Sequence, residues 1–233
     1  FNISRGKSKA RSETKTYSEI FGQTLVKMGK ENEKIVGITA AMPQGTCMNM
    51  FAEEFPDRTY DVGIAEQHAV TLSAGLARGG MKPVTAIYST FLQRGFDQIV
   101  QDISMQDLPV TLGIDRAGIV GADGETHQGV FDISFLRIIP NLTILAPKDE
   151  NELQHLLYTA VNLDKPTAVR YPRGEGYGVK LDKTLRKIPE GKGEVLKTGT
   201  KVLIIAVGSR VLPSLEAASI LSRQGISTGV INA

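Results

Sequence analysis

The sequence predicts an α/β fold in which a parallel sheet is covered by helices on both faces, followed by an incomplete second α/β unit. Short, almost continuously apolar runs alternate with helical patterns, and strands that are buried on both faces have this composition. The alternation continues as one series to about residue 172, as repeated strand–helix units do. A basic, irregular stretch then separates it from a second strand–helix–strand series near the end of the chain.

The helices are predicted, in chain order, from apolar side chains that recur every three or four residues. Gly63 separates a short strand from the helix that follows it, and the Asp-Glu pair at residues 149 and 150 favours a helix start. These patterns place the helices of the first unit at residues 17–30, 48–54, 65–78, 91–105, 131–137 and 149–163.

Between these helices, apolar runs rich in β-branched residues predict strands. The strands lie at residues 34–40, 60–62, 83–89, 109–115, 142–147 and 167–172. In the second unit, strands at residues 201–209 and 227–233 flank an amphipathic helix over residues 211–225. Ligands bind beyond the carboxyl ends of the strands in parallel sheets, so we expect the functional residues in the loops that follow the strands.

The composition argues against several classes of function. The formal net charge of the 233 residues is +2, which does not indicate a nucleic-acid surface. No apolar run approaches the roughly 20 residues that span a bilayer. Cys47 is the only cysteine, so an internal disulfide or a multi-cysteine metal site is not possible, which is typical of a reducing compartment. The P-loop and nucleophile-elbow motifs do not occur.

We divide the chain where its composition changes. Residues 1–16 are basic and rich in serine, and although a transit peptide has a similar composition, we interpret them as a solvated linker or arm. Residues 17–178 form the main domain, residues 179–193 a connector, and residues 194–233 the start of a second, truncated domain. The chain stops directly after a predicted strand, which indicates a piece of a longer protein.

Glu66 is the first candidate site residue, because no basic residue lies three or four positions from it on its helix. The helix N-terminus favours the ionised carboxylate, whereas burial favours the protonated form. A first-turn capping role and a working acid are equally good interpretations of this residue. The same helix carries small residues on one face, at positions 65, 69, 73 and 77. This stripe predicts a tightly packed interface, and a second subunit is a candidate for the other side.

Tyr88, Phe91 and Arg94 surround a corner between a strand and the next predicted helix. Phe91 and Arg94 lie about one turn apart and off the apolar stripe of that helix. An aromatic ring in this place needs a flat or apolar cover, either a bound heterocycle or a neighbouring domain. Tyr88 ends the strand, so we expect its hydroxyl group to point into the same crevice.

Arg116, Asp123 and His127 lie in or beside the glycine-rich loop over residues 118–129. The order Asp123, Glu125, His127 lacks the further oxygen ligands of a calcium loop and any cysteine, so we expect no metal ligand in this chain. His127 is the best acid–base candidate among the three histidines. The histidine at position 68 faces away from Glu66, and the one at position 155 lies inside a helix, where we expect a structural role.

Arg173 lies just beyond the last strand of the first unit, between a proline and a glycine. Arginine at the carboxyl end of a sheet commonly binds phosphate or carboxylate through its planar fork. Together with Arg116, it indicates a small phosphorylated substrate.

Four stretches carry a resemblance to a known family: YDVGIAEQHAV, AIYSTFLQRGFDQ, DRAGIVGADGETHQG and VRYPRG. In this order and spacing they resemble the 1-deoxy-D-xylulose-5-phosphate synthases, thiamine diphosphate enzymes of the transketolase-like superfamily. The resemblance implies that residues 17–178 are the pyrimidine-binding domain and residues 194–233 the start of the C-terminal domain. The family's magnesium and diphosphate motif does not occur in these residues, so the Mg²⁺ ligands and the N-terminal diphosphate-binding domain are expected outside this chain.

The resemblance also implies roles on the cofactor side. Glu66 matches the glutamate that hydrogen-bonds N1′ of the aminopyrimidine, where protonation prepares the exocyclic nitrogen to remove the thiazolium C2 proton. Phe91 matches the ring that stacks on the aminopyrimidine. Arg94 lies in the same motif and helps to build this pocket.

On the substrate side, the resemblance implies that Tyr88, Arg116 and Arg173 position the phosphate of glyceraldehyde 3-phosphate. Asp123 and His127 match polar residues near the reacting carbonyl groups, with His127 as a proton donor or positioner. The implied reaction is the decarboxylative condensation of pyruvate with D-glyceraldehyde 3-phosphate to 1-deoxy-D-xylulose 5-phosphate and CO₂. It feeds the methylerythritol phosphate pathway to isoprenoids and the synthesis of thiamine and pyridoxal precursors.

The resemblance further implies a homodimer, in the bacterial cytoplasm rather than the plastid stroma, with neither a nucleic acid nor a membrane as a partner. Two alternatives remain. One is part of another thiamine enzyme, such as a transketolase or the β chain of a 2-oxoacid dehydrogenase, which has these two domains without the diphosphate-binding one. The motifs YSTFLQR and GADGETHQG favour the synthase pattern. The other alternative is a non-catalytic dimerisation fragment, and without the missing domain we expect the isolated chain to be inactive.

Overall fold

The computed structural model describes residues 14–233, so the predicted linker at residues 1–16 lies outside the described part except for its end. The strands are β1 (Ile35–Thr39), β2 (Thr59–Asp61), β3 (Lys82–Tyr88), β4 (Thr111–Asp115), β5 (Thr143–Leu145), β6 (Thr167–Arg170), β7 (Glu194–Lys197), β8 (Val202–Ala206) and β9 (Thr228–Asn232). The helices are α1 (Tyr17–Glu31), α2 (Met48–Glu54), α3 (Glu66–Arg78), α4 (Ser89–Leu92), α5 (Phe96–Gln98), α6 (Asp132–Leu136), α7 (Glu150–Val161) and α8 (Val211–Arg223).

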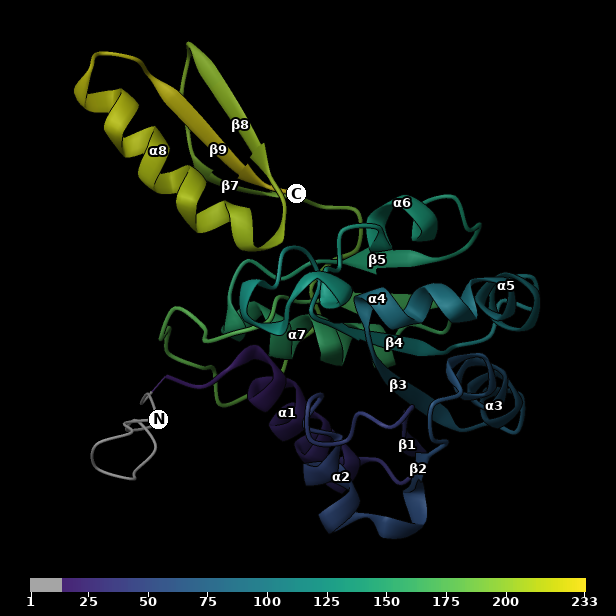
Figure 1. Ribbon diagram of the computed structural model, residues 1–233. Helices are drawn as coiled ribbons and strands as arrows, with labels where there is room; N and C mark the ends of the chain where they lie inside the picture. The colour runs from purple at the N-terminus through teal and green to yellow at the C-terminus, as the bar shows by residue number, and fades with distance from the viewer. Residues whose placement is uncertain (1–13) are drawn as a thin grey trace, which may run out of the picture.

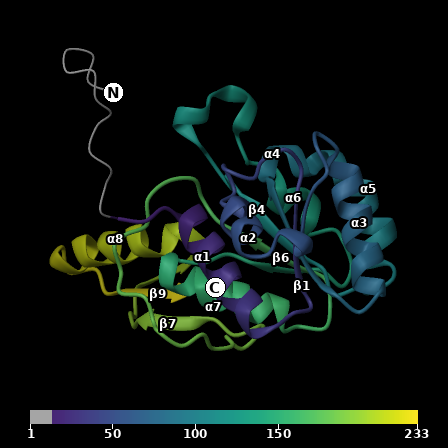
Figure 2. The same cartoon turned by 90° about the horizontal axis from the view of Figure 1, so that it is seen from below.

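The first sheet has the strand order β2-β1-β3-β4-β6-β5, and every pair of neighbouring strands is parallel. Helices α1, α2 and α7 cover one face, while α3, α6 and the helical segment after β3 cover the other (Figures 1 and 2). Along β1, Val36 and Ile38 point into one apolar cluster and Ile35 into the other, as the two-residue period of a strand requires. The predicted fold class is confirmed.

A capping box begins α1 and positions its first turn against the sheet. The Thr16 hydroxyl accepts a hydrogen bond from the Glu19 backbone N–H, and the Glu19 carboxylate accepts one from the Thr16 backbone N–H. Such caps contribute about 1 kcal/mol of helix stability. They hold Ser18, in the first turn of α1, at the end of β4, where its hydroxyl donates to Asp115.

The segment predicted as a helix over residues 91–105 is helical throughout residues 89–104, but it is not one regular α-helix, because its winding changes three times. After α4 it forms a 3₁₀ turn (Gln93–Gly95), α5 and a π-helical stretch (Ile99–Ser104). The first change includes Gly95, where an added Cβ would lie 2.9 Å from Val70 Cγ2 on α3. A glycine weakens a helix and here lets the segment approach α3, so that α3 and α5 lie side by side (Figures 1 and 2).

The small-residue stripe of α3 packs on the sheet of its own chain. Ala69, Ser73 and Ala77 are buried, and the Ser73 hydroxyl hydrogen-bonds the hydroxyl of Thr85 on β3. The prediction that a second subunit could cover this stripe is therefore wrong. Small side chains let the helix axis approach the strands closely, which needs no partner chain.

The second sheet has the order β7-β9-β8, with α8 packed against β9 (Figure 1). Strands β8 and β9 are parallel and match the predicted strand–helix–strand unit. Strand β7 was not predicted; it pairs antiparallel with β9. Its four residues begin with Glu194 and end with Lys197, so they lack the apolar run by which the other strands were identified. None of the helices between residues 14 and 233 has the length and apolar content that a membrane-spanning segment needs.

Candidate active site

The candidate site lies where β3, β4 and β6 end. Tyr88 and Asp115 are register partners at the ends of β3 and β4, and the backbone of Tyr171, just after β6, hydrogen-bonds that of Ile114 and Ala117. Because the strands are parallel, the loops that follow them leave from the same edge of the sheet. This edge carries the arginine, aspartate and histidine residues that the sequence singled out.

Glu66 is a buried carboxylate at the start of α3, with 2% of its surface exposed. Within residues 14–233, no donor makes a hydrogen bond to its carboxylate. The nearest cation is Arg94, whose Nη1 lies 3.9 Å from Glu66 Oε2 and whose side chain is 58% exposed. The helical spacing within α3 could not reveal this partner, because it comes from the irregular segment that packs against α3. A buried carboxylate without a hydrogen-bond donor can accept one from a ligand.

The rings of Tyr88, Phe91 and His127 form one cluster after β3 and in the glycine-rich loop. The Tyr88 and Phe91 rings stack with their centroids 5.9 Å apart, and the His127 ring meets Phe91 edge-on at 5.3 Å. Phe91 is half-buried and packs against the apolar cluster under α3. Its position off the predicted apolar stripe had indicated a more exposed ring. His127 Nδ1 lies 2.9 Å from the Thr126 hydroxyl.

Arg116 is the most densely contacted side chain of the site. Its guanidinium lies 4.0 Å above the Tyr88 ring, and Nη1 donates to the backbone oxygen of Gly45. Nη1 also lies 3.0 Å from Asp115 Oδ1, and Nε lies 3.3 Å from Asp123 Oδ2. Burial is the largest single effect on Arg116 and lowers the pKa of the guanidinium, but Asp115, Tyr88 and Asp123 together outweigh burial and raise this pKa.

Asp123 bridges the two arginines that were predicted to bind phosphate. Its Oδ1 lies 2.6 Å from Arg173 Nε, while its Oδ2 faces Arg116 Nε. The structure therefore brings Arg116, Asp123 and Arg173 together, and it places His127 beside the rings of Tyr88 and Phe91. An anion that binds both arginines has to share them with this carboxylate.

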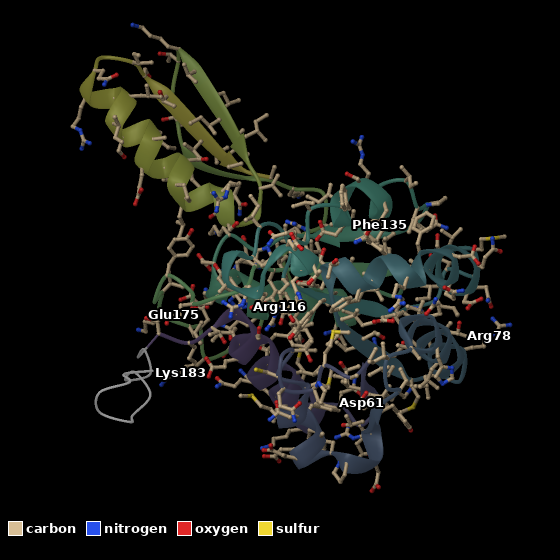
Figure 3. The ribbon with its side chains drawn as sticks, viewed as in Figure 1. Asp61, Arg78, Arg116, Phe135, Glu175 and Lys183 are labelled. Atoms are coloured by element: carbon tan, nitrogen blue, oxygen red, sulfur yellow. The ribbon has the colours of Figure 1, made fainter. Side chains whose placement is uncertain are left out.

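A cavity of about 280 Å³ opens beside the two arginines, between the first turn of α1 and the loop after β1. Ser18, Gly45, Arg116, Arg173 and Glu175 are among its lining residues. Figure 3 shows Arg116 near the middle of the molecule and Glu175 toward the N-terminal side. A larger cavity of about 870 Å³ lies between α7, the connector and β9, and no predicted site residue lines it.

We call Arg116, Arg173 and the residues in contact with them the arginine pocket. Three residues of this pocket were not predicted. Ser18 and Gly45 come from α1 and from the loop after β1, far from Arg116 in the sequence. Asp115 precedes Arg116 directly, and a charged residue at the end of an apolar strand was the signal that could have identified it. Burial raises the pKa of Asp115 to about 6, against the opposing effects of Arg116 and of the hydrogen bond from Ser18.

The other two histidines and Arg170 lie outside this group of contacts. His155 is 1% exposed and hydrogen-bonds Asp182, as expected for a structural residue, and His68 is exposed. Arg170 pairs through two nitrogens with the buried Asp132. Within residues 14–233, no group of three or more histidine, cysteine, aspartate or glutamate side chains is placed to hold a metal ion.

Two family models match the chain. The pyrimidine-binding domain of transketolase matches residues 13–177, and the transketolase C-terminal domain matches residues 191–233. Among curated relatives, 1-deoxy-D-xylulose-5-phosphate synthase of Halothermothrix orenii is 66% identical over 233 residues, and 1-deoxy-D-xylulose-5-phosphate synthase 1 of Geobacter sulfurreducens is 58% identical over 234. The alignments cover 100% of this chain but 37% of each relative, so the chain spans little more than a third of their length.

Solved structures share the fold. One is described as a split gene transketolase, an inactive β4 tetramer; it is 31% identical with a TM-score of 0.81, and the match covers 93% of this chain and 70% of that one. Transketolase from Campylobacter jejuni is 21% identical, also with a TM-score of 0.81, over 99% of this chain and 37% of that one. At that identity the second structure shows the fold alone.

Proposed function

The chain belongs to the transketolase family, and we propose that it forms the pyrimidine-side part of a 1-deoxy-D-xylulose-5-phosphate synthase. The observation that carries the proposal is the buried carboxylate of Glu66, which accepts no hydrogen bond from the described residues and lies in a stretch that matches the family's glutamate motif. The two relatives that carry the synthase name, at 58% and 66% identity, support this choice within the family. We assign residues 17–178 to the pyrimidine-binding domain and residues 194–233 to the beginning of the C-terminal domain, joined by residues 179–193.

The residues present fit thiamine diphosphate on its pyrimidine side. Glu66 suits N1′ of the aminopyrimidine, because a ring N–H there would supply the missing hydrogen bond. Phe91 presents a half-buried ring that can stack on a heterocycle, and Arg94 stands at the exposed side of the carboxylate. When bound, thiamine diphosphate supplies the carbon nucleophile for pyruvate and takes up the charge that decarboxylation leaves. Mg²⁺ and the diphosphate would be held by the N-terminal domain of the complete enzyme.

This chain then contributes proton control and orientation. Glu66 holds the proton at N1′ and moves it as the bound ring changes its charge. Arg116 and Arg173 bind the phosphate of glyceraldehyde 3-phosphate through charge-assisted hydrogen bonds, with the Tyr88 ring as one wall. His127, beside Phe91, donates a proton to or positions the aldehyde oxygen, and Asp123 lies between the two arginines.

The complete enzyme would be a homodimer of the bacterial cytoplasm, which makes 1-deoxy-D-xylulose 5-phosphate and CO₂ for isoprenoid, thiamine and pyridoxal synthesis. The bacterial relatives support this setting. The isolated chain would be inactive, because it lacks the N-terminal domain that would hold the diphosphate and Mg²⁺. In line with this, a relative of similar extent, the split gene transketolase, is described as an inactive tetramer of β chains.

The test is an assay of the complete enzyme with pyruvate, glyceraldehyde 3-phosphate, thiamine diphosphate and Mg²⁺, without any lipoyl carrier. We expect equal amounts of CO₂ and 1-deoxy-D-xylulose 5-phosphate. Turnover that requires a lipoyl domain would instead assign the chain to a 2-oxoacid dehydrogenase, and transfer from ketose phosphates without pyruvate would assign it to a transketolase. The 233-residue chain alone should release no CO₂, and micromolar binding of thiamine diphosphate by it would contradict the proposed division of the site.

A further inference from the structure

Asp115 is a buried carboxylate in contact with the Arg116 guanidinium, and none of the proposed roles uses it. We propose that Asp115 is a positioning residue that fixes the guanidinium of Arg116 for the phosphate of the aldehyde substrate. The inference rests on the proposed function, because that function supplies the phosphorylated aldehyde.

Asp115 has no exposed surface and is surrounded by three donors. The Ser18 hydroxyl donates to Oδ2 at 2.6 Å, and the backbone N–H of Arg116 donates to Oδ1 at 2.6 Å. Arg116 Nη1 lies 3.0 Å from the same Oδ1. A carboxylate held in this way cannot turn, so it fixes one edge of the guanidinium.

The backbone of Arg116 is left-handed, with φ at 59°. An arginine in this conformation costs roughly 1 kcal/mol and persists where surrounding contacts hold it. Nη1 donates to the Gly45 carbonyl oxygen 2.5 Å away as well as facing Asp115, and Nε faces Asp123. Among the described residues, Nη2 has no acceptor. Two of the three nitrogens are thus engaged by the protein, which leaves Nη2 to a ligand in the adjoining cavity.

Removal of the Asp115 charge would free the Nη1 side of the Arg116 guanidinium to move. Arg116 would keep Asp123 as a partner, but Asp123 also pairs with Arg173 and ends a short 3₁₀ turn (Gly121–Asp123) rather than a strand of the sheet. The guanidinium would then populate several orientations, and phosphate binding would have to select one of them. This effect is confined to ligands that carry the phosphate, because Asp115 lies beneath Arg116 and has no surface that a ligand could touch.

The chain offers a matched control in Asp132 and Arg170. Asp132 is 1% exposed and holds Arg170 Nε at 2.9 Å, so this pair is as buried as that of Asp115 and Arg116. Neither residue lines the arginine cavity. Asp132→Asn therefore reproduces the loss of a buried ion pair near the same sheet edge without touching the proposed phosphate site.

The experiment compares Asp115→Asn, Asp132→Asn and wild type in the complete enzyme. For Asp115→Asn we expect KM for glyceraldehyde 3-phosphate to rise about 10-fold to 100-fold, the effect of one weakened charge-assisted contact. The kcat value, KM for pyruvate and KM for unphosphorylated glyceraldehyde should stay within about twofold of wild type. Asp132→Asn should leave all of these values unchanged. An unchanged KM for the phosphorylated aldehyde in Asp115→Asn, or an equal loss with both aldehydes, would overturn the proposal.

A binding measurement separates this inference from the proposed function. Calorimetry with inorganic phosphate needs no turnover, and Asp115→Asn should weaken binding by the same factor as it raises KM. If wild type consumes neither pyruvate nor the aldehyde, the proposed function fails. The comparison of phosphate affinity between wild type and Asp115→Asn still decides the role of Asp115: a weaker affinity in the variant supports it, and an equal affinity overturns it. If Asp115→Asn does not fold, Ser18→Ala removes one donor to Asp115, and we expect about a fivefold weaker affinity for phosphate. Unchanged affinity in Ser18→Ala would then overturn the inference.

Discussion

The guanidinium of Arg94 lies 3.9 Å from the carboxylate of Glu66, although the two residues belong to different helical segments. Glu66 is buried at the start of α3, whereas Arg94 is largely exposed in the turn that contains Gly95. The close approach of the two segments at Gly95 makes this pairing possible. The carboxylate is thus accompanied by one cation and accepts no hydrogen bond from the described part of the chain.

Glu66→Gln in the complete enzyme should lower kcat by about 10²-fold to 10⁴-fold, because an amide cannot exchange a proton with N1′. Circular dichroism and the melting temperature should stay near wild type, since glutamine has the same shape. His68→Gln, on the exposed side of the same helix, serves as the control and should keep full activity. Wild-type turnover by Glu66→Gln would refute the proposed mechanism.

Arg173→Met should raise KM for glyceraldehyde 3-phosphate by about 10-fold to 100-fold and leave KM for pyruvate unchanged. The side chain lines the arginine cavity, and the substitution removes its charge while keeping much of its volume. Arg78→Met is the matched control, because Arg78 is exposed at the end of α3, far from Arg116 in Figure 3. Steady-state kinetics with each substrate varied in turn would show the difference. A parallel rise in both KM values would point to misfolding instead of a lost phosphate contact.

Gly45→Ala should perturb the same pocket by steric conflict. A Cβ at this position would lie 1.7 Å from the Tyr88 hydroxyl oxygen, so the Tyr88 ring and the Arg116 guanidinium above it would have to shift. We expect destabilisation by about 1–3 kcal/mol and a higher KM for the phosphorylated aldehyde. Combining it with Tyr88→Phe removes the nearest atom and should recover part of the stability, which a double-mutant cycle measures.

The control for this substitution is Gly75→Ala on α3, where a Cβ would meet no atom within 4 Å. It should be neutral or should stabilise by up to about 1 kcal/mol, because alanine is the better helix former. If Gly45→Ala behaves like Gly75→Ala, the Tyr88 hydroxyl is not held against the loop after β1.

Asp115 should make stability depend on pH. Burial raises its pKa from 3.8 to about 6, so the folded chain binds this proton more tightly than the unfolded chain does. The resulting stabilisation is complete below pH 3.8 and is lost as the pH rises through 6. Compared with Asp115→Asn, wild type should therefore lose roughly 3 kcal/mol of unfolding free energy between about pH 4 and pH 7.5.

Chemical denaturation of both variants of the 233-residue chain at several pH values measures this difference, and the other titrating groups cancel in the comparison. Arg116, Tyr88 and Tyr171 surround Asp115, and both tyrosines have raised pKa values, so neither titrates in this window. If the difference in unfolding free energy between the two variants does not change with pH, Asp115 of the folded chain is ionised over the whole pH range measured.

Most of the fold followed from local patterns. The first-unit strands and helices lie within a few residues of their predicted bounds, because burial on both faces of a parallel sheet imposes an apolar run on each strand. The exceptions have local causes. Gly95 lies where the predicted helix changes its winding, and β7 is too short and too polar to stand out.

The predicted site residues also came from local signals, namely polar side chains just after apolar strands and a ring off a helical stripe. Tyr88, Phe91, Arg116, Asp123 and Arg173 do lie in one series of contacts. Their proposed roles depend on the family and on the experiments above, since geometry alone does not identify a substrate.

The sequence by itself determined the α/β class, the edge of the sheet that carries the site, and most of the residue types on it. Only the tertiary structure decided which charged and polar groups meet: Glu66 with Arg94, Asp115 with the Ser18 hydroxyl, and Asp123 with two arginines at once. The physical reason is range. Apolar periodicity acts over one or two turns of chain, whereas an ion pair depends on a few ångströms between segments whose distance is set by the packing of the whole sheet.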